Sequence, residues 1–163
     1  MRVLSGYEAD QAHQWLERAR QVATTSGCLR ARCGTVIVRQ HGTEAIIGQG
    51  SNGPPGGIAG QARCLRKHEI SSTFRSDKTC CIHSEQQAIL DAMPNQADFP
   101  YSRLYFVRLD DQDRIKPSGQ PYCTICSKMT LHVGIAEFCL IHQTGITVYG
   151  AEEYNDLSYL YTV

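Results

Sequence analysis

The strongest constraint on the fold is a pair of short motifs that lie far apart in the sequence. The first is His-Ser-Glu at residues 83–85, and the second is Pro-Tyr-Cys-Thr-Ile-Cys at residues 121–126. One imidazole and two thiolates are ligands that Zn²⁺ prefers, and three protein ligands leave a fourth tetrahedral position for water. If His83, Cys123 and Cys126 share one ion, the chain must fold so that the two motifs meet.

Glu85 lies two residues after the histidine, beside the expected water position. His-x-Glu followed by Pro-Cys-x-x-Cys is the signature of zinc-dependent base deaminases, in which the glutamate transfers protons and does not bind the metal. On these residues the chain resembles the cytidine deaminase superfamily, most closely its deoxycytidylate deaminase-like members. The resemblance implies a hydrolytic deaminase of a cytosine nucleotide or nucleoside that releases a uracil product and ammonia, with Glu85 as the catalytic residue.

The resemblance also implies a three-layer α-β-α fold around a mixed five-stranded sheet, and local patterns agree with it. Apolar residues recur at helical spacing over residues 9–23, after the capping-box pair Ser5 and Glu8, and Gly27 is expected to end this first helix. A β-hairpin is predicted next, because residues 34–39 are β-branched and a short turn follows them. The later elements are predicted to be helices starting at His83 and near Cys123 and strands over 104–107, 135–141 and 146–149.

The connection between the last two predicted strands is only four residues long, from His142 to Gly145. A parallel connection needs a dozen or more residues, so these strands are expected to be antiparallel. By resemblance, free-nucleoside cytidine deaminases share this hairpin, whereas deoxycytidylate deaminases have a helix there. The acidic, aromatic tail over residues 152–161 is expected to pack on the domain rather than to cover the site.

Length and charge favour one catalytic domain, residues 1–163, that acts on a small molecule. Sixteen basic residues balance sixteen acidic ones, so no overall positive field attracts nucleic acid. No apolar run resembles a signal peptide or a membrane span, so a cytoplasmic location is expected. Relatives commonly assemble, so a homo-oligomer is expected. The alternatives are a deaminase of a base in RNA or DNA or of a purine, and a non-catalytic zinc-binding protein.

Eight cysteines are more than the catalytic set requires. Several deoxycytidylate deaminases have a second, structural zinc, and Cys28, Cys64 and Cys80 resemble its ligand positions. Such a site would tie a long loop to the domain and contribute folding free energy. The fourth ligand is open, with Cys81, Cys33 and His68 as candidates. The alternative is that these cysteines are free and pack as small hydrophobic residues.

Two residues are expected to contact the substrate. Asn52 begins an Asn-Gly-x-Pro segment, which by resemblance contacts the sugar of a bound nucleotide. Ser84 stands where the family usually has alanine, at a helix N-terminus whose free backbone donors can bind a carbonyl oxygen. Tyr122 is a second departure, since it separates the family's proline from the first cysteine.

Overall fold

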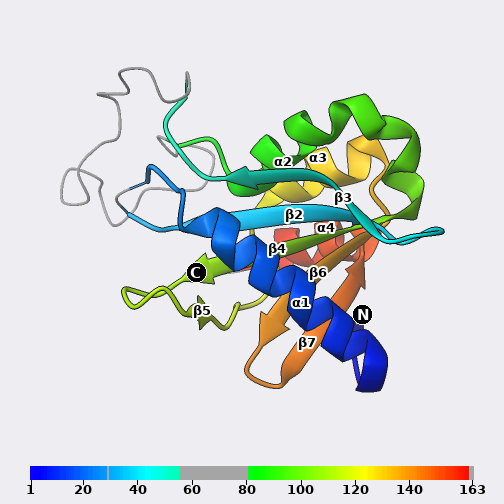
Figure 1. The fold of residues 1–163 in the computed structure, drawn as a ribbon, viewed down its shortest axis with the longest axis horizontal. Coiled ribbons are helices and arrows are strands. Elements are labelled where there is room, and N and C mark those ends of the chain that lie inside the picture. The colour runs from blue at the N-terminus through cyan, green and yellow to red at the C-terminus, as the bar shows by residue number, and fades with distance from the viewer. Residues whose placement is uncertain (29, 56–80, 162–163) are drawn as a thin grey trace.

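A sheet of seven strands runs through the middle of the structure, a computed structural model that describes residues 1–28, 30–55 and 81–161 (Figure 1). The strand order is β1-β7-β6-β4-β2-β3, and β5 pairs with β4 outside this path. The strands are β1 (Arg2–Val3), β2 (Cys33–Arg39), β3 (Ala45–Ser51), β4 (Ser102–Leu109), β5 (Ile115–Lys116), β6 (Glu137–His142) and β7 (Gly145–Gly150). The expected five strands are therefore present, and the two additional strands have two residues each.

The strand directions match the sequence expectation. β6 and β7 are antiparallel, with His142 opposite Gly145 at the turn, and β4 pairs with β6 in parallel. The hairpin of β2 and β3 is also antiparallel. The sheet is therefore mixed, and its last two strands form the hairpin that the short connection requires.

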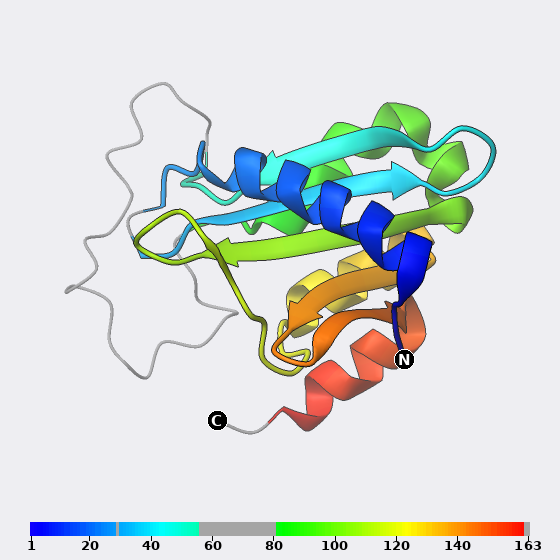
Figure 2. The same cartoon turned by 60° about the horizontal axis from the view of Figure 1, so that its bottom comes forward.

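Helices cover both faces of the sheet (Figures 1 and 2). The helix α1 lies on one face and contacts mainly β2 and β4. The second face carries α2, α3 and α4, together with a 3₁₀ segment, η3. The bounds are α1 (Gly6–Ala23), α2 (Ser84–Ala92), η3 (Met93–Tyr101), α3 (Thr124–Val133) and α4 (Ala151–Leu160). This is the predicted three-layer arrangement, and the acidic tail is a helix packed on β6, β7 and α3.

Alternation along the strands separates two hydrophobic cores. On β2, Val36 and Val38 pack in the cluster under α1, whereas Ile37 packs in the cluster under α2. On β4, Tyr105 and Val107 again point towards α1. Successive side chains of a strand point to opposite faces, so the even-numbered residues of β4 are directed to the side of α2, α3 and α4.

Two glycines on β3 allow α2 to approach the sheet closely. A Cβ atom on Gly48 would lie 2.5 Å from the carbonyl oxygen of Ala88. One on Gly50 would lie 2.5 Å from the nitrogen of Ala88 and 2.7 Å from the carbonyl oxygen of Ser84. These distances are too short for a side chain at either position. The position of the first turn of α2 therefore depends on the absence of side chains in β3.

Both ends of α1 differ from the expectation. Ser5 is the N-cap, but its side chain makes no capping hydrogen bond. Glu8 instead accepts hydrogen bonds from Arg2 at 2.6 and 2.7 Å and from Arg103 at 3.1 Å, because two guanidiniums compete with the backbone for its carboxylate. The helix ends at Ala23 and not at Gly27, since Thr24 to Ser26 turn back onto the last carbonyl groups.

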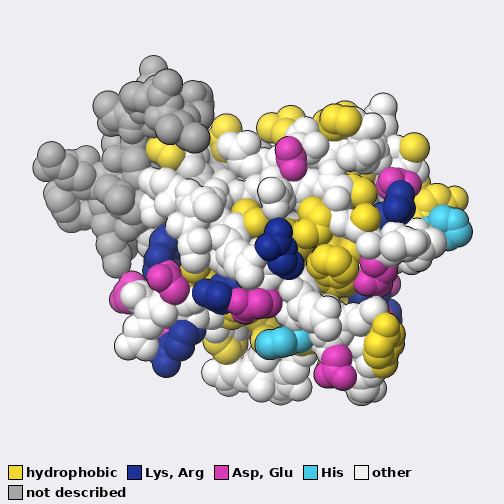
Figure 3. Space-filling model, viewed as in Figure 1, with side chains coloured by type: hydrophobic (Ala, Val, Ile, Leu, Met, Phe, Trp, Pro, Cys, Tyr) yellow, Lys and Arg dark blue, Asp and Glu magenta, His cyan; other side chains and the backbone are white. Residues whose placement is uncertain are grey.

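The surface agrees with the balanced composition. On the face shown in Figure 3, acidic and basic side chains are intermixed over the described residues, without a large patch of one sign. Among the described helices, none combines the length and the apolar character that crossing a bilayer requires.

Candidate active site

The two sequence motifs meet where the N-termini of α2 and α3 lie side by side. His83 is the N-cap of α2, and Cys123 is the N-cap of α3. The Nδ1 atom of His83 lies 3.3 Å from Sγ of Cys123 and 3.1 Å from Sγ of Cys126, and the two sulfur atoms are 3.0 Å apart. Within the described part of the chain, this is the one group of three or more potential metal-ligating side chains that converge.

This donor set fits a catalytic zinc ion. Ligands of a tetrahedral zinc with bonds of about 2.0–2.3 Å lie about 3.3–3.8 Å apart, so the three side chains need only separate slightly to hold one. Both cysteines are buried, and the histidine is half-buried. Three protein ligands leave one position open, which is the pattern of a catalytic site rather than a structural one.

Glu85 is held beside these ligands by a relay of hydroxyl groups. Thr35 on β2 donates to Oγ of Ser84 at 2.8 Å, and Ser84 donates to Oε2 of Glu85 at 3.0 Å. All three side chains are buried. The Ser84 hydroxyl therefore orients the carboxylate, while its expected contact with substrate remains a prediction.

Burial and neighbouring charges shift the acidity of the site. Desolvation raises the pKa of Glu85, and the negative charge of the Cys123 thiolate adds to the effect. A hydrogen bond from the Cys126 thiol lowers the pKa of Cys123 to about 5, with His83 contributing in the same direction. The pKa of Cys126 is raised, since it keeps the proton that it shares with Cys123. The site thus contains a cysteine that ionises readily beside a carboxyl group that takes up a proton more readily than an exposed one.

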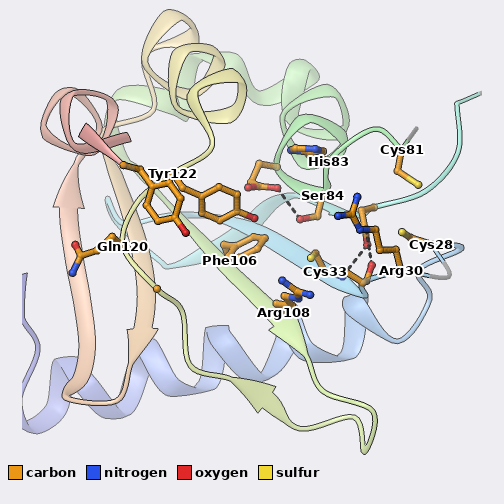
Figure 4. A pocket seen from close by; sticks show the side chains of 15 residues that line it. Cys28, Arg30, Cys33, Cys81, His83, Ser84, Phe106, Arg108, Gln120 and Tyr122 are labelled. Carbon is orange, nitrogen blue, oxygen red and sulfur yellow. Dashed lines mark hydrogen bonds between the residues drawn. The ribbon is translucent and has the colours of Figure 1, made fainter. Parts of the chain in front are cut away.

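A pocket of about 460 Å³ opens directly onto this group. Figure 4 shows Tyr122 towards one end and Arg30 towards the other, with Phe106, Arg108 and His83 in the part between them. Phe106 and Arg108 are even-numbered residues of β4, so they point to the side of α2. Cavities of this size accommodate small organic ligands. The remaining lining residues include Cys28, Ala31, Cys33, Asn52, Cys81, Ser84, Glu85, Gly119, Gln120 and Tyr161.

The positive charges of Arg30 and Arg108 in the pocket are not neutralised by carboxylates of the described residues. Arg30 and Arg108 are exposed, and within the described ranges neither has a carboxylate at ion-pair distance. The neighbouring Arg32, by contrast, is paired with Asp113. Two unpaired guanidiniums in a pocket can bind an anionic group of a ligand.

Asn52 lines the pocket, but its amide mainly supports the surrounding loops. Its Oδ1 accepts hydrogen bonds from Cys33 N at 2.8 Å and Ser26 Oγ at 2.7 Å, and its Nδ2 donates to the Ala31 carbonyl at 2.7 Å. One amide hydrogen therefore remains for a ligand. The expected sugar contact stays a prediction that rests on this single donor.

Only some of the predicted ligands of the second zinc site are among the described residues. Cys64, Cys80 and His68 lie outside the described residues, whereas Cys28, Cys33 and Cys81 line the catalytic pocket. Over the described ranges, these last three do not form a metal-ligating group of their own. The structural zinc therefore remains a prediction.

Several pocket residues could not be identified from motifs. Thr35 lies inside an ordinary β-branched strand, and Phe106 and Arg108 are separated from the metal ligands by a loop. Tyr161 lies in the tail, for which packing was expected, yet it also reaches the pocket. One signal could have been used: Phe106 and Arg108 are two residues apart, so their side chains point to the same face of β4. This becomes informative once it is known which face of β4 lies under α2.

Comparison of the sequence with known proteins finds deoxycytidylate deaminases. The protein of that name from Schizosaccharomyces pombe is 28% identical over 126 residues, covering 76% of this chain and 33% of the yeast protein. The one from Saccharomyces cerevisiae is 29% identical over 136 residues, covering 82% of this chain and 34% of the relative. The chain thus spans about a third of the length of these relatives. No protein-family model matches it.

Solved structures with similar folds include two types of deaminase. The dCMP deaminase of cyanophage S-TIM5, in complex with dCMP and dUMP, aligns with a TM-score of 0.53 and 21% identity over 83% of this chain and 82% of that one. The cytidine deaminase from Burkholderia pseudomallei aligns with a TM-score of 0.56 and 15% identity over 87% and 94%. The chain has the cytidine deaminase-like fold that its motifs predict.

Proposed function

We propose that this chain, which belongs to the cytidine and deoxycytidylate deaminase superfamily, is a zinc-dependent hydrolytic deaminase of a cytosine nucleotide or nucleoside. The observation that carries the proposal is the convergence of His83, Cys123 and Cys126 beside the buried carboxyl group of Glu85, at the base of a pocket. A purely structural zinc protein would need neither an open coordination position nor a buried acid next to it.

The residues of the pocket divide the chemistry among them. Zinc, when bound by the three ligands, supplies a water molecule that is acidic enough to act as a nucleophile at neutral pH. Glu85 would accept one proton of that water and deliver it to the ring nitrogen of the cytosine. It would then take the remaining hydroxyl proton, as the carbonyl of the product forms, and pass it to the amino group, which leaves as ammonia. Its raised pKa suits a group that must both accept and donate a proton. Thr35 and Ser84 keep the carboxyl group in position.

The arginines of the pocket support a monophosphate over a free nucleoside. Arg30 lies across the pocket from Tyr122, so a ring near Tyr122 and a phosphate near Arg30 would satisfy both (Figure 4). The relatives named deoxycytidylate deaminase point the same way. The hairpin of β6 and β7 was expected to favour the nucleoside, but it lies in the sheet and supplies no residue that lines the pocket.

Ammonia release measures the proposed activity directly. Zinc-loaded protein is incubated with cytidine, deoxycytidine, their monophosphates, cytosine, adenosine and guanine. We expect release from a pyrimidine compound, with the monophosphates preferred. Glu85→Gln should keep its zinc and its melting temperature but lose activity by a factor of about 10²–10⁴ or more, because the proton carrier is gone. An active Glu85→Gln protein would contradict the mechanism.

Arg30→Ala provides the control for substrate class. It should raise KM for the monophosphate and leave the free nucleoside unaffected, because only the phosphate meets the guanidinium. Silence across the panel, together with activity on a cytosine-containing oligonucleotide, would favour deamination of a base within nucleic acid. The homo-oligomer remains a separate prediction, which light scattering of the same preparation tests.

A further inference from the structure

Two tyrosines from distant parts of the chain meet at the rim of the pocket. The ring centroids of Tyr122 and Tyr161 are 5.6 Å apart, with an interplanar angle of 47°. Both side chains line the pocket, yet Tyr122 is 47% and Tyr161 45% exposed. Each ring thus has surface available to a ligand, in a pocket whose polar chemistry lies next to it.

The positions of both rings are tied to the metal-ligating helix. Tyr122 directly precedes Cys123 in the sequence. Tyr161 ends α4, and α4 is joined to α3 by buried hydroxyl groups: Ser127 and Ser158 are 2.9 Å apart at Oγ. Since Ser127 follows Cys126, a short rigid path connects a zinc ligand with the helix that carries Tyr161.

Aromatic packing holds α4 from its other side. Tyr154 is buried and stacks on Phe138 of β6 with centroids 3.9 Å apart and an interplanar angle of 10°. Tyr149 of β7 meets Tyr154 edge to face at 5.7 Å. With contacts to the sheet and to α3, the helix presents its last turn at a defined place.

We propose that the tyrosine pair, Tyr122 and Tyr161, is a positioning clamp that stacks against the pyrimidine ring and holds its amine-bearing carbon over Glu85. The clamp rests on the proposed function and deepens it by assigning the ring-recognition surface. Both tyrosines offer a π-face, which binds flat rings, and within the described residues neither hydroxyl group is engaged in a hydrogen bond. The C-terminal helix is thereby part of substrate selection rather than only of packing.

Binding of a product-like ligand tests the clamp apart from turnover. Calorimetric titration with dUMP should show that Tyr161→Ala weakens binding by about tenfold, in the range found for base–aromatic stacking. Tyr161→Phe should bind like the wild type, since the ring and not the hydroxyl group acts. Tyr159→Ala is the matched control, because Tyr159 lies on the same helix, is exposed and does not line the pocket.

Kinetics give a second readout that a merely structural role would not reproduce. Tyr161→Ala should raise KM more than it lowers kcat, with zinc content and melting temperature unchanged. Affinity within twofold of the wild type, or an equal loss in Tyr159→Ala, would overturn the clamp. So would a wild-type protein that binds no pyrimidine nucleotide.

The two proposals fail separately. Ammonia release that Tyr161→Ala leaves unchanged would overturn the clamp and leave the deaminase in place. Tyrosine-dependent binding of dUMP by a wild-type protein that deaminates nothing would support the clamp and overturn the deaminase.

Discussion

Each face of the sheet packs a hydrophobic core against helices, but only the face under α2 and α3 also borders the pocket described above. Under α1, apolar side chains surround one largely buried charge, Arg103, which donates to Glu137 at 2.7 Å and to Glu8 at 3.1 Å. Under α2 and α3, the polar groups are instead directed into a pocket. The face under α1 satisfies its charge internally, whereas the opposite face also directs charged side chains, among them Glu85 and Arg108, into a pocket.

Glycine serves both faces in the same way. A Cβ atom on Gly34 would lie 2.2 Å from the carbonyl oxygen of Ala19 in α1, and one on Gly50 would lie 2.7 Å from that of Ser84 in α2. Close helix packing is therefore a general feature of this sheet. Only under α2 does it also set the position of the residues proposed to be catalytic, so equivalent substitutions on the two faces should have different effects on activity.

The largest contrast is expected between two buried cysteines. Cys126 lies in the metal-ligating group, and Cys139 on β6 lies in the core under α1, where burial raises its pKa to about 12. Cys126→Ala should abolish zinc binding and turnover. Cys139→Ala should keep both and lose about 1 kcal/mol of unfolding free energy, because it removes only a small buried group. Zinc analysis and denaturant unfolding measure the pair; zinc retained by Cys126→Ala would contradict the ligand assignment.

A smaller contrast is expected between the glycines. Gly50→Ala should push the first turn of α2 away from β3, and a displacement of about 1 Å can cost about 10²-fold in rate. Gly34→Ala should lower the unfolding free energy by about 1–3 kcal/mol or more through overpacking, while the folded molecules keep their activity. Activity per zinc-loaded, folded molecule is the measurement. Equal loss of activity in both variants would show that the faces are mechanically coupled.

The smallest expected effect is the loss of unfolding free energy at low pH through Glu8, which lies on the face under α1. Hydrogen bonding to Arg2, with help from Arg103, lowers the pKa of Glu8 to about 2. A lowered pKa stabilises the folded state above the ordinary value near 4.5, and this stability is lost as the pH falls towards 2. Glu8→Gln should therefore differ from the wild type most at neutral pH and least at pH 2.

Salt and activity provide the checks on this acid effect. The Glu8 side chain is partly exposed, so its contribution is modest and should shrink further in high salt. Deamination by Glu8→Gln should match that of the wild type, since Glu8 lies across the sheet from the pocket. A pH-independent difference in stability would show that packing, not charge, accounts for its effect.

The sequence motifs were sufficient to predict that His83, Cys123 and Cys126 converge, and to predict the order of the elements. This convergence could be predicted because the ligand types and spacing of a zinc site are restrictive, and zinc binding by the three residues stays a prediction. The β6–β7 hairpin followed from the length of its turn. Both inferences depend on local or covalent constraints, which a single sequence contains.

What could not be predicted depends on distant partners. Glu8 matched a capping box, but Arg103, far along the chain, competes for its carboxylate. Phe106 and Arg108 became pocket residues only when the sheet defined which side of β4 faces α2. Tyr161 required the path of α4 across α3. In each case the role of the residue depends on a contact with a residue far away in the sequence, and such a contact produces no local sequence pattern.

The hairpin of β6 and β7 has an electrostatic consequence. Because β7 reverses the chain direction, α4 runs back across the sheet and brings its C-terminal end to the pocket, with Tyr161 as its cap. The helices α2 and α3 present their N-terminal ends, capped by His83 and Cys123. Helix dipoles place partial positive charge at N-termini and partial negative charge at C-termini. The end of α4 therefore places partial negative charge beside Tyr122, close to the partial positive charge at His83 and Cys123, so the potential changes sign over a short distance at this part of the pocket.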